Sequence, residues 1–173
     1  MINVSSLGQM YSPVRFSDYN FTSGKPVPPE ETPNWERLIW RGSKQTLEYE
    51  GMVAYGQSKT ANVLFSACLT EHLARSGIYS FALHPGAVLS VGGMPLLDEL
   101  PEHVLKAFPA MKSIDQGAST TLVAAFDPKL NPGDGVFLSD CQMFKPADWA
   151  LDSNSAEKLW KLSEQLTGQE FQL

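Results

Sequence analysis

The 173-residue sequence predicts an α/β protein with a doubly wound parallel sheet, about three strands flanked by helices. Two observations predict this class. Short apolar runs of strand length alternate with longer segments whose apolar residues recur at helical spacing. The order of these elements is strand, long helix, strand, helix, strand, helix, which is typical of crossover connections between parallel strands. Residues 1–173 read as a single domain.

The first 76 residues divide into three segments that differ in composition. Residues 1–6, MINVSS, read as a short strand that ends in two hydroxyl side chains. Residues 7–50 form a polar, proline-containing insertion that is rich in loops, with one short helix expected around 34–41. From Gly51 onward the apolar spacing becomes helical, so we expect one long helix at 52–76 that stops at Gly77.

The second half of the chain continues the alternation. The segment IYSFALHPG reads as a strand that is ended by its Pro-Gly pair. Residues 91–112 resemble a substrate lid, a loop with short helices. A helix with Ser113 as its N-cap candidate follows, and GDGVFLSD is a turn that runs into a strand. A last helix is expected at 154–167, closed by Gly168.

Charge and composition exclude several classes of protein. The net charge is -6 and the basic residues are scattered, which argues against nucleic-acid binding and favours a small-molecule or protein partner. No apolar run approaches the roughly 18 residues of a membrane span, and no signal-like segment opens the chain, so the expected location is cytoplasmic. Cys68 and Cys141 lack metal-ligand or disulfide spacing and read as free thiols, buried or half-buried.

The stretch VAYGQSKTANVLF places Tyr55 and Lys59 one turn apart on the same helix face. Taken alone, this spacing is more typical of a surface pair than of a site. Its context adds chemistry, because the helix follows a strand that ends in Ser6. An ammonium near a phenol favours the phenolate, so such a tyrosine can exchange a proton with a carbonyl or alcohol oxygen. A serine hydroxyl beside it can polarise the same oxygen.

Three motifs, INVSS, YGQSK and HPGAVLS, occur in an order and at separations that resemble the short-chain dehydrogenase/reductase family. DQGASTTLVAA, GVFLSDC and AEKLWKLSEQLTG further resemble its retinol-dehydrogenase-like and fungal reductase branch. The resemblance implies that Ser6 polarises the substrate carbonyl and that Tyr55 donates the proton. It also implies that Lys59 favours the phenolate and, together with Tyr55, contacts the nicotinamide cofactor at its ribose.

The resemblance also implies cofactor contacts at the end of the second strand, from Gly86, Val88 and Ser90. It covers only the C-terminal catalytic half of the family pattern, since no G-x-x-x-G-x-G motif occurs in the sequence. The implied fold is an incomplete Rossmann-like sheet whose N-terminal dinucleotide-binding half is missing. The first strand is then expected to present an edge of unpaired backbone groups.

The function implied by this resemblance is an NADP(H)-dependent oxidoreductase, truncated, that interconverts a carbonyl and an alcohol. The choice of NADP over NAD rests on the family alone. A small lipophilic substrate is preferred because Trp35 and Trp40 could wall an apolar pocket, together with four residues of the lid-like segment: Met94, Leu96, Leu97 and Phe108.

Two alternatives stay open. In the first, Tyr55 acts as a cofactor-independent acid-base group in an isomerase, dehydratase or cyclase. In the second, the chain is a non-catalytic interaction module that binds a partner through its open strand edge or its long helix. A homodimer or a completing partner chain is possible in either case. His84 is expected to be a strand-end residue rather than a base, and no metal-ligand spacing is present.

Overall fold

The computed structural model describes residues 1–88, 100–107 and 111–171. Its strands are β1 (Ile2–Val4), β2 (Phe81–His84), β3 (Phe137–Ser139) and β4 (Gln142–Met143). Its α-helices are α1 (Trp35–Trp40), α2 (Gly51–Leu73), α4 (Glu102–Ala107), α5 (Ile114–Phe126) and α6 (Ser153–Thr167). Short 3-10 helices link them: η1 (Leu7–Met10), η2 (Pro29–Glu31), η3 (Ala74–Ser76), η4 (Pro132–Asp134) and η5 (Asp148–Leu151).

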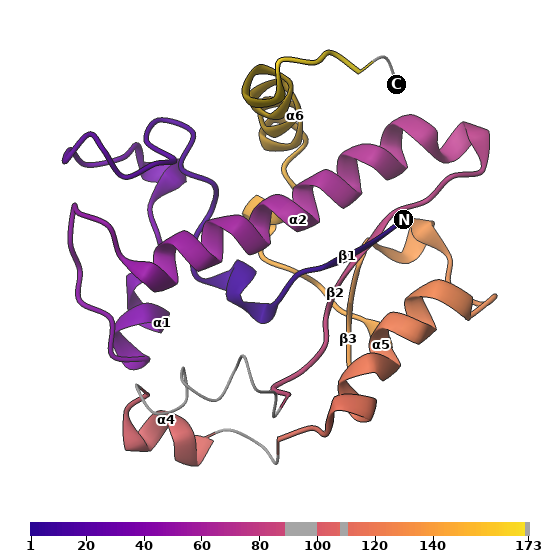
Figure 1. Cartoon of the computed structure of the whole chain (residues 1–173), viewed down its shortest axis with the longest axis horizontal. Helices are drawn as coiled ribbons and strands as arrows, with labels where there is room; N and C mark the ends of the chain where they lie inside the picture. Colours follow the sequence, from indigo (N-terminus) through magenta and orange to yellow (C-terminus); the bar gives the residue numbers. More distant parts are fainter. Residues whose placement is uncertain (89–99, 108–110, 172–173) are drawn as a thin grey trace.

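The sheet has the strand order β1-β2-β3-β4, and its first three strands are parallel (Figure 1). This confirms the predicted incomplete parallel sheet. The two-residue strand β4 pairs antiparallel with β3 and was not predicted, since two residues carry no readable alternation. The turn between them places Asp140 and Cys141 in left-handed conformations, at φ of 50° and 62°.

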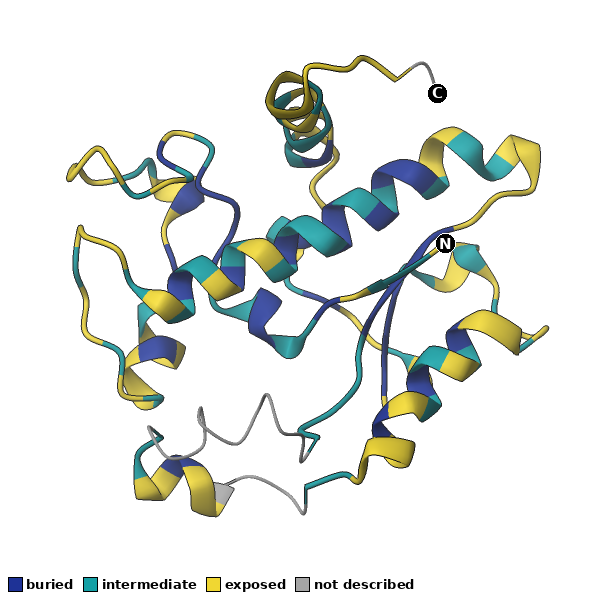
Figure 2. Ribbon diagram, viewed as in Figure 1, coloured by how far each residue is buried: buried dark blue, intermediate teal, exposed yellow. Residues whose placement is uncertain are grey.

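Helices cover the sheet on both faces because successive side chains of a strand point to opposite sides. Ala82 of β2 packs with Val63 of α2, while Leu83 of β2 packs with Ala124 of α5. Helix α6 lies across α2, where Ala156 joins the cluster formed around Leu64. Figure 2 shows the result, with β2 and β3 buried between helices whose outer sides are exposed.

Helix α2 is held tightly against η1, the turn that follows β1. A Cβ atom on Gly56 would lie 3.0 Å from Tyr11 Cβ, 3.1 Å from the carbonyl oxygen of Gly8 and 3.1 Å from the amide nitrogen of Ser12. The Thr60 hydroxyl, one turn further along α2, donates to this segment, at 3.0 Å from the Gln9 carbonyl oxygen and 2.7 Å from the Ser12 carbonyl oxygen. The absence of a side chain at position 56 therefore allows this close approach.

The short helix expected around 34–41 is α1, capped by the Asn34 side chain. The long helix ends at Leu73 and continues as η3 to Ser76, one residue before the predicted stop. Of the lid-like segment 91–112, residues 91–99 and 108–110 lie outside the described residues, and α4 is its described helix.

Two further sequence predictions concern thiols and membranes. Both cysteines are free, and Cys68 is buried as expected. Cys141 is exposed rather than half-buried, because it sits at the tip of the β3–β4 turn. Among the helices that the structure describes, none combines the length and the apolar character needed to cross a bilayer.

The Gly56 contact gives a stability prediction. Gly56→Val should lower the free energy of unfolding by roughly 1–3 kcal/mol, because the new side chain meets the backbone of η1. Gly51→Ala is the matched control, since nothing lies within 4 Å of its Cβ position, and it should change stability by less than about 0.5 kcal/mol. Urea unfolding followed by circular dichroism measures both. Equal midpoints for the two variants would contradict the close packing.

Candidate active site

Ser6 immediately follows β1 and caps η1. Its Oγ accepts a hydrogen bond from the Gly8 amide at 3.0 Å. A hydroxyl that accepts such a bond still has its own proton to donate. The side chain is therefore fixed in position while its donor capacity remains available for another oxygen.

Tyr55 lies on α2 directly over η1. A Cβ atom on Gly8 would fall 2.5 Å from Tyr55 Cε1 and 3.5 Å from Ser6 Oγ, so both side chains lie against this glycine. The tyrosine is 40% exposed, which leaves it accessible to a ligand. The structure thus brings Ser6 and Tyr55 together on the two sides of Gly8. Gly8 was not among the site residues predicted from the sequence, because a single glycine after a strand carries no specific signal.

Lys59 is placed by α2 beside the ring of Tyr55, with its Nζ 5.5 Å from the ring centroid. The same ammonium donates to the backbone carbonyl oxygen of Val4 at 3.3 Å, and Asn62 Nδ2 donates to that oxygen at 3.1 Å. The Ser5 hydroxyl donates to the Lys59 carbonyl oxygen at 2.7 Å and fixes this turn of α2 on the strand. Lys59 therefore sits between the tyrosine and the strand edge.

The Val4 carbonyl belongs to the open edge of β1. The Phe81 amide donates to Met1 and the Ser5 amide donates to Leu83, so alternate residues of β1 bond to β2 and Val4 faces away from it. The predicted row of unpaired edge groups is therefore incorrect at this position. Side chains from α2 satisfy the carbonyl because the helix crosses close to the end of the strand.

The Pro-Gly segment after β2 packs on the approach to α5. A Cβ atom on Gly86, which has a φ of 98°, would lie 2.6 Å from Lys112 Cδ. Val88 forms a parallel bridge with Lys112 and contacts Gly117, whose Cβ position is 2.5 Å from Val88 Cγ2. Ser90 lies outside the described residues, so its cofactor contact stays a prediction.

A titratable cluster that the sequence did not reveal lies at the ends of β2 and β3. Lys112 pairs with Asp140, and this hydrogen bond lowers the pKa of the Asp140 carboxyl. Burial lowers the pKa of His84, and its Nδ1 has no hydrogen-bond partner among the described residues. His84 is thus neutral near neutral pH, and its role as a strand-end residue rather than a base stays a prediction.

A cavity of about 830 Å³ opens on the side of η1. Its lining includes Leu7 and Met10 from η1, Tyr11 directly after it, and Trp40 from α1. Burial is the main reason that the pKa of Tyr11 is raised, and the nearby Tyr55 adds to it. Of the two tryptophans expected in an apolar pocket, Trp40 lines this cavity while Trp35 lines another. Met94, Leu96, Leu97 and Phe108 fall outside the described residues.

A nicotinamide dinucleotide fits only part of this arrangement. Tyr55 and Lys59 offer a hydroxyl and an ammonium near the carboxyl end of β1, where a ribose could be held. The strand-to-helix turn at this edge is not a phosphate cradle, because the ring of Tyr55 fills the space over Gly8. The residues present therefore fit the nicotinamide end of the cofactor and not its pyrophosphate.

The α/β sheet, parallel over its first three strands, thus carries serine, tyrosine and lysine side chains gathered at the end of its first strand. Several known proteins are similar to this chain. Retinol dehydrogenase 12 of Mus musculus is 31% identical over 97% of this chain and 45% of that protein. TIC 32 A, a chloroplastic short-chain dehydrogenase of Brassica napus, is 37% identical over 68% of this chain and 38% of its own length.

A third relative and one solved structure are also similar to this chain. The human WW domain-containing oxidoreductase is 34% identical over 88% of this chain and 34% of its own length. A crystal structure of an uncharacterized protein from Mycobacterium paratuberculosis superimposes with a TM-score of 0.59 at 26% identity, over 99% of this chain and 51% of that one. No family model matches the chain. The chain belongs to the short-chain dehydrogenase/reductase family and spans less than half the length of these curated relatives.

The contact at Gly8 gives a prediction for the site. Gly8→Ala should push the Tyr55 ring toward solvent, because the added methyl group would otherwise lie 2.5 Å from Cε1. Nitration of Tyr55 by tetranitromethane, mapped by mass spectrometry, should then become several-fold faster. Gly51→Ala serves as control, and nitration of Tyr79, which is similarly exposed at 39%, should stay constant in both variants. An unchanged rate at Tyr55 in Gly8→Ala would contradict the contact.

Proposed function

We propose that this chain carries the proton-transfer site of a dehydrogenase/reductase that interconverts a carbonyl and an alcohol. The observation that carries the proposal is the meeting of Ser6 and Tyr55 over Gly8, with one side chain fixed by a backbone bond and the other accessible. Two hydroxyl-bearing side chains that lie against the same glycine are suited to a single ligand oxygen.

In the reductive direction, Tyr55 donates its phenolic proton to the substrate oxygen as that oxygen gains negative charge. The Ser6 hydroxyl donates a hydrogen bond to the same oxygen and stabilises it. The positive charge of Lys59 near the ring favours the phenolate that remains. Asn62 keeps the Val4 carbonyl satisfied when Lys59 turns to another acceptor. The oxidative direction reverses the proton's path.

The proposed cofactor is NADP(H), held at its nicotinamide end by Tyr55 and Lys59, with Gly86, Val88 and Ser90 as the proposed neighbours. When bound, it supplies or accepts the hydride. The supporting argument is the membership of the family together with the hydroxyl and ammonium beside β1. We further propose a cytoplasmic location, and a homodimer or a completing partner chain as the assembled state.

The proposed substrate is a small lipophilic carbonyl or alcohol. The cavity beside η1 supports it, since Leu7, Met10 and Trp40 give it apolar walls next to the segment that carries Gly8. The name of the relative retinol dehydrogenase 12 makes retinal a reasonable first probe for this class. The space available, about 830 Å³, lies in the range typical of small-molecule sites.

Catalysis by Tyr55 is testable with a matched pair of tyrosines. Tyr55→Phe should lower NADPH-dependent reduction of retinal, or of another lipophilic aldehyde, by about 100-fold or more, because the proton donor is lost. Tyr79→Phe, at a similarly exposed position between η3 and β2, should leave the rate unchanged. Absorbance of NADPH at 340 nm follows the reaction, and calorimetry measures binding of NADPH to each variant. No binding of NADPH at millimolar concentration would overturn the reductase proposal for this chain.

One observation favours a second candidate. Lys59 donates to the strand edge and the ring of Tyr55 lies over Gly8 of η1, which suits an acid-base site that works without a cofactor. Such a protein would isomerise, dehydrate or cyclise its substrate. An activity that persists without NADPH and disappears in Tyr55→Phe would favour this reading over the reductase.

A further inference from the structure

The cavity beside η1 has charged side chains in addition to its apolar walls. Its lining includes Arg37 of α1 and Arg41, which directly follows that helix. The two residues are four positions apart, so their side chains leave the helix on the same side. Among the described residues of this lining, Glu36 is the acidic one, so two cations meet one anion there although the chain as a whole carries a net charge of -6.

The position of α1 directs these arginines toward the segment that carries the acid-base site. The Asn34 amide donates to the Tyr11 carbonyl oxygen at 2.7 Å and ties the start of α1 to the end of η1. Leu38 of α1 is fully buried and fixes the inner side of the helix, while Arg37 and Arg41 line the cavity. The guanidinium carbon of Arg41 lies 5.4 Å from the centroid of the Tyr11 ring.

Tyr11 links the cavity to the acid-base site. A Cβ atom on Gly56, the residue after Tyr55, would lie 3.0 Å from Tyr11 Cβ. Burial raises the pKa of the Tyr11 hydroxyl, the charge of Arg41 opposes this rise, Tyr55 adds to it, and Arg37 opposes it. Both guanidinium charges and the phenol of Tyr55 therefore act on the same hydroxyl group, which lines the cavity.

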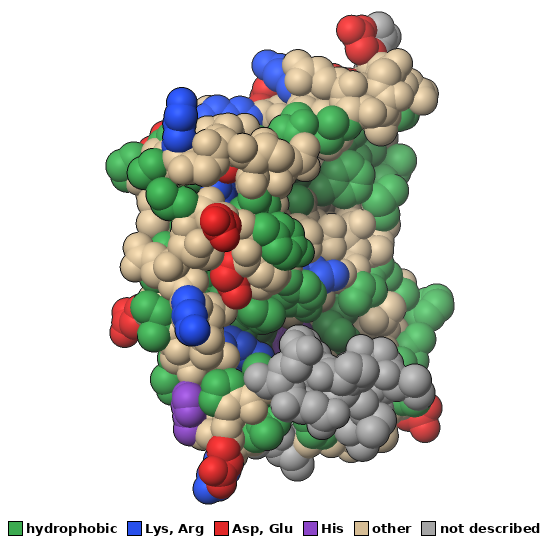
Figure 3. All heavy atoms as spheres, turned by 60° about the vertical axis from the view of Figure 1, so that its left-hand side comes forward, with side chains coloured by type: hydrophobic (Ala, Val, Ile, Leu, Met, Phe, Trp, Pro, Cys, Tyr) green, Lys and Arg blue, Asp and Glu red, His purple; other side chains and the backbone are tan. Residues whose placement is uncertain are grey.

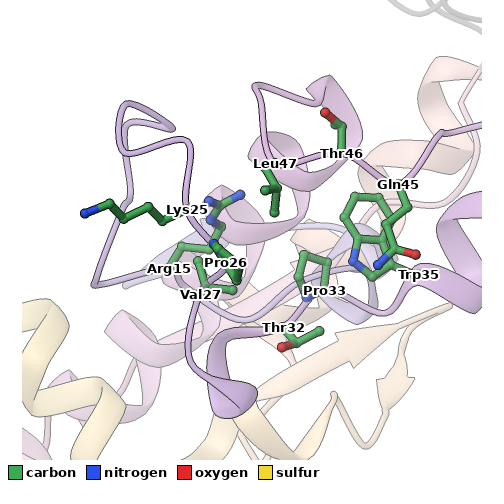
Figure 4. A pocket seen from close by; sticks show the side chains of 10 residues that line it. All are labelled: Arg15, Lys25, Pro26, Val27, Thr32, Pro33, Trp35, Gln45, Thr46 and Leu47. Atoms are coloured by element: carbon green, nitrogen blue, oxygen red, sulfur yellow. The ribbon is translucent and has the colours of Figure 1, made fainter.

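Arg37 is available to a ligand. It is exposed, and its side chain makes no ion pair with another residue in the described part of the chain. A second cavity, of about 480 Å³ within the 7–50 insertion, is different (Figure 4). Its Arg15 is buried and paired with Asp18 at 3.0 Å, and its Lys25 ammonium points away from the other lining residues. The cavity beside η1 is therefore the better candidate for an anionic ligand.

Charges of both signs are interspersed on this side of the molecule. Figure 3 brings forward the side that carries α1 and shows acidic and basic side chains scattered among apolar ones. The choice of ligand therefore depends on the groups that line the cavity rather than on the field of the whole face. Guanidinium groups beside apolar walls are suited to a ligand that carries an anionic group on an apolar body.

We propose that the substrate of the acid-base site carries a carboxylate remote from its carbonyl or hydroxyl group, and that Arg37 and Arg41 bind this carboxylate. The inference rests on the proposed function and narrows its substrate from a small lipophilic carbonyl or alcohol to an apolar oxo- or hydroxy-carboxylic acid. A carboxylate is preferred over a phosphate because Glu36 lies in the same lining and repels a dianion more strongly than a monoanion.

The test compares 4'-(hydroxymethyl)biphenyl-4-carboxylate with the corresponding carboxamide, which has nearly the same shape and no charge. Calorimetry on the full chain, without cofactor, measures the affinity of each. The acid should bind at least about 10-fold more tightly, because hydrogen bonds from a guanidinium to a carboxylate are stronger than those to a neutral amide. Equal affinities, or no binding of either compound, would overturn the proposal.

Substitution of Arg37 tests which residue reads the charge. Arg37→Gln should lower the affinity for the acid by about 10-fold and leave that for the amide unchanged, while Arg37→Lys should keep part of the preference. Arg75→Gln is the matched control, since Arg75 is exposed on η3 and does not line the cavity, and it should alter neither affinity. A thermal melt checks that each variant is folded. An unchanged preference in folded Arg37→Gln would contradict the proposal.

Tyr55→Phe tests whether the same ligand reaches the acid-base site. It should weaken the acid and the amide by a similar factor of several-fold, because both lose the contact with their common hydroxyl group. Unchanged binding of both compounds would place them outside that site and overturn the proposal.

NADPH-dependent reduction of the two matching aldehydes tests the proposed function separately. Preferential binding of the acid without reduction of either aldehyde would contradict the reductase and leave the carboxylate site standing. Reduction of both aldehydes with equal kcat/KM, together with equal binding of the acid and the amide, would overturn the carboxylate site alone.

Discussion

The close packing of α2 on η1 is the constraint on which the site depends. Gly56 lets the helix backbone approach the turn, and Thr60 satisfies two carbonyl groups of that turn from the same helix face. With α2 in this position, Tyr55 falls over Gly8 and next to Ser6. A larger residue at position 56 would move the helix away from the turn and Tyr55 away from Ser6, so the proposed site depends on a contact in which no functional group takes part.

The position of α2 also brings hydrogen-bond donors to the open edge of the sheet. Exposed strand edges present unpaired backbone groups that promote association. Here Lys59 and Asn62 reach the outward carbonyl of Val4, so one helix supplies both the candidate acid-base residue and the groups that cover the strand end. Lys59 therefore makes a structural contact in addition to its proposed role in proton transfer, and Asn62 is a second donor to the same carbonyl oxygen.

The sequence predicted the elements well where their signals were long or chemically specific. The parallel order of the strands, the long helix that carries Tyr55, the short helix near residue 35 and the Ser113 cap were all readable from spacing and composition. The two-residue strand β4 and the exposed position of Cys141 depend on a turn with two left-handed residues that are not glycine. Gly8 and the bonds to Val4 were not readable, since they arise from where α2 crosses the strand, a tertiary property with no local pattern.

The central claim is that the ring of Tyr55 lies against Gly8, beside Ser6. Nuclear Overhauser spectra of the isotopically labelled chain measure this directly. We predict a strong cross-peak between the Tyr55 ring ε protons and the Gly8 α protons, because a Cβ position on Gly8 lies only 2.5 Å from Cε1. The absence of that cross-peak in a folded sample, with the contact between Gly56 and the Tyr11 β protons present, would contradict the arrangement of the site while leaving the fold intact.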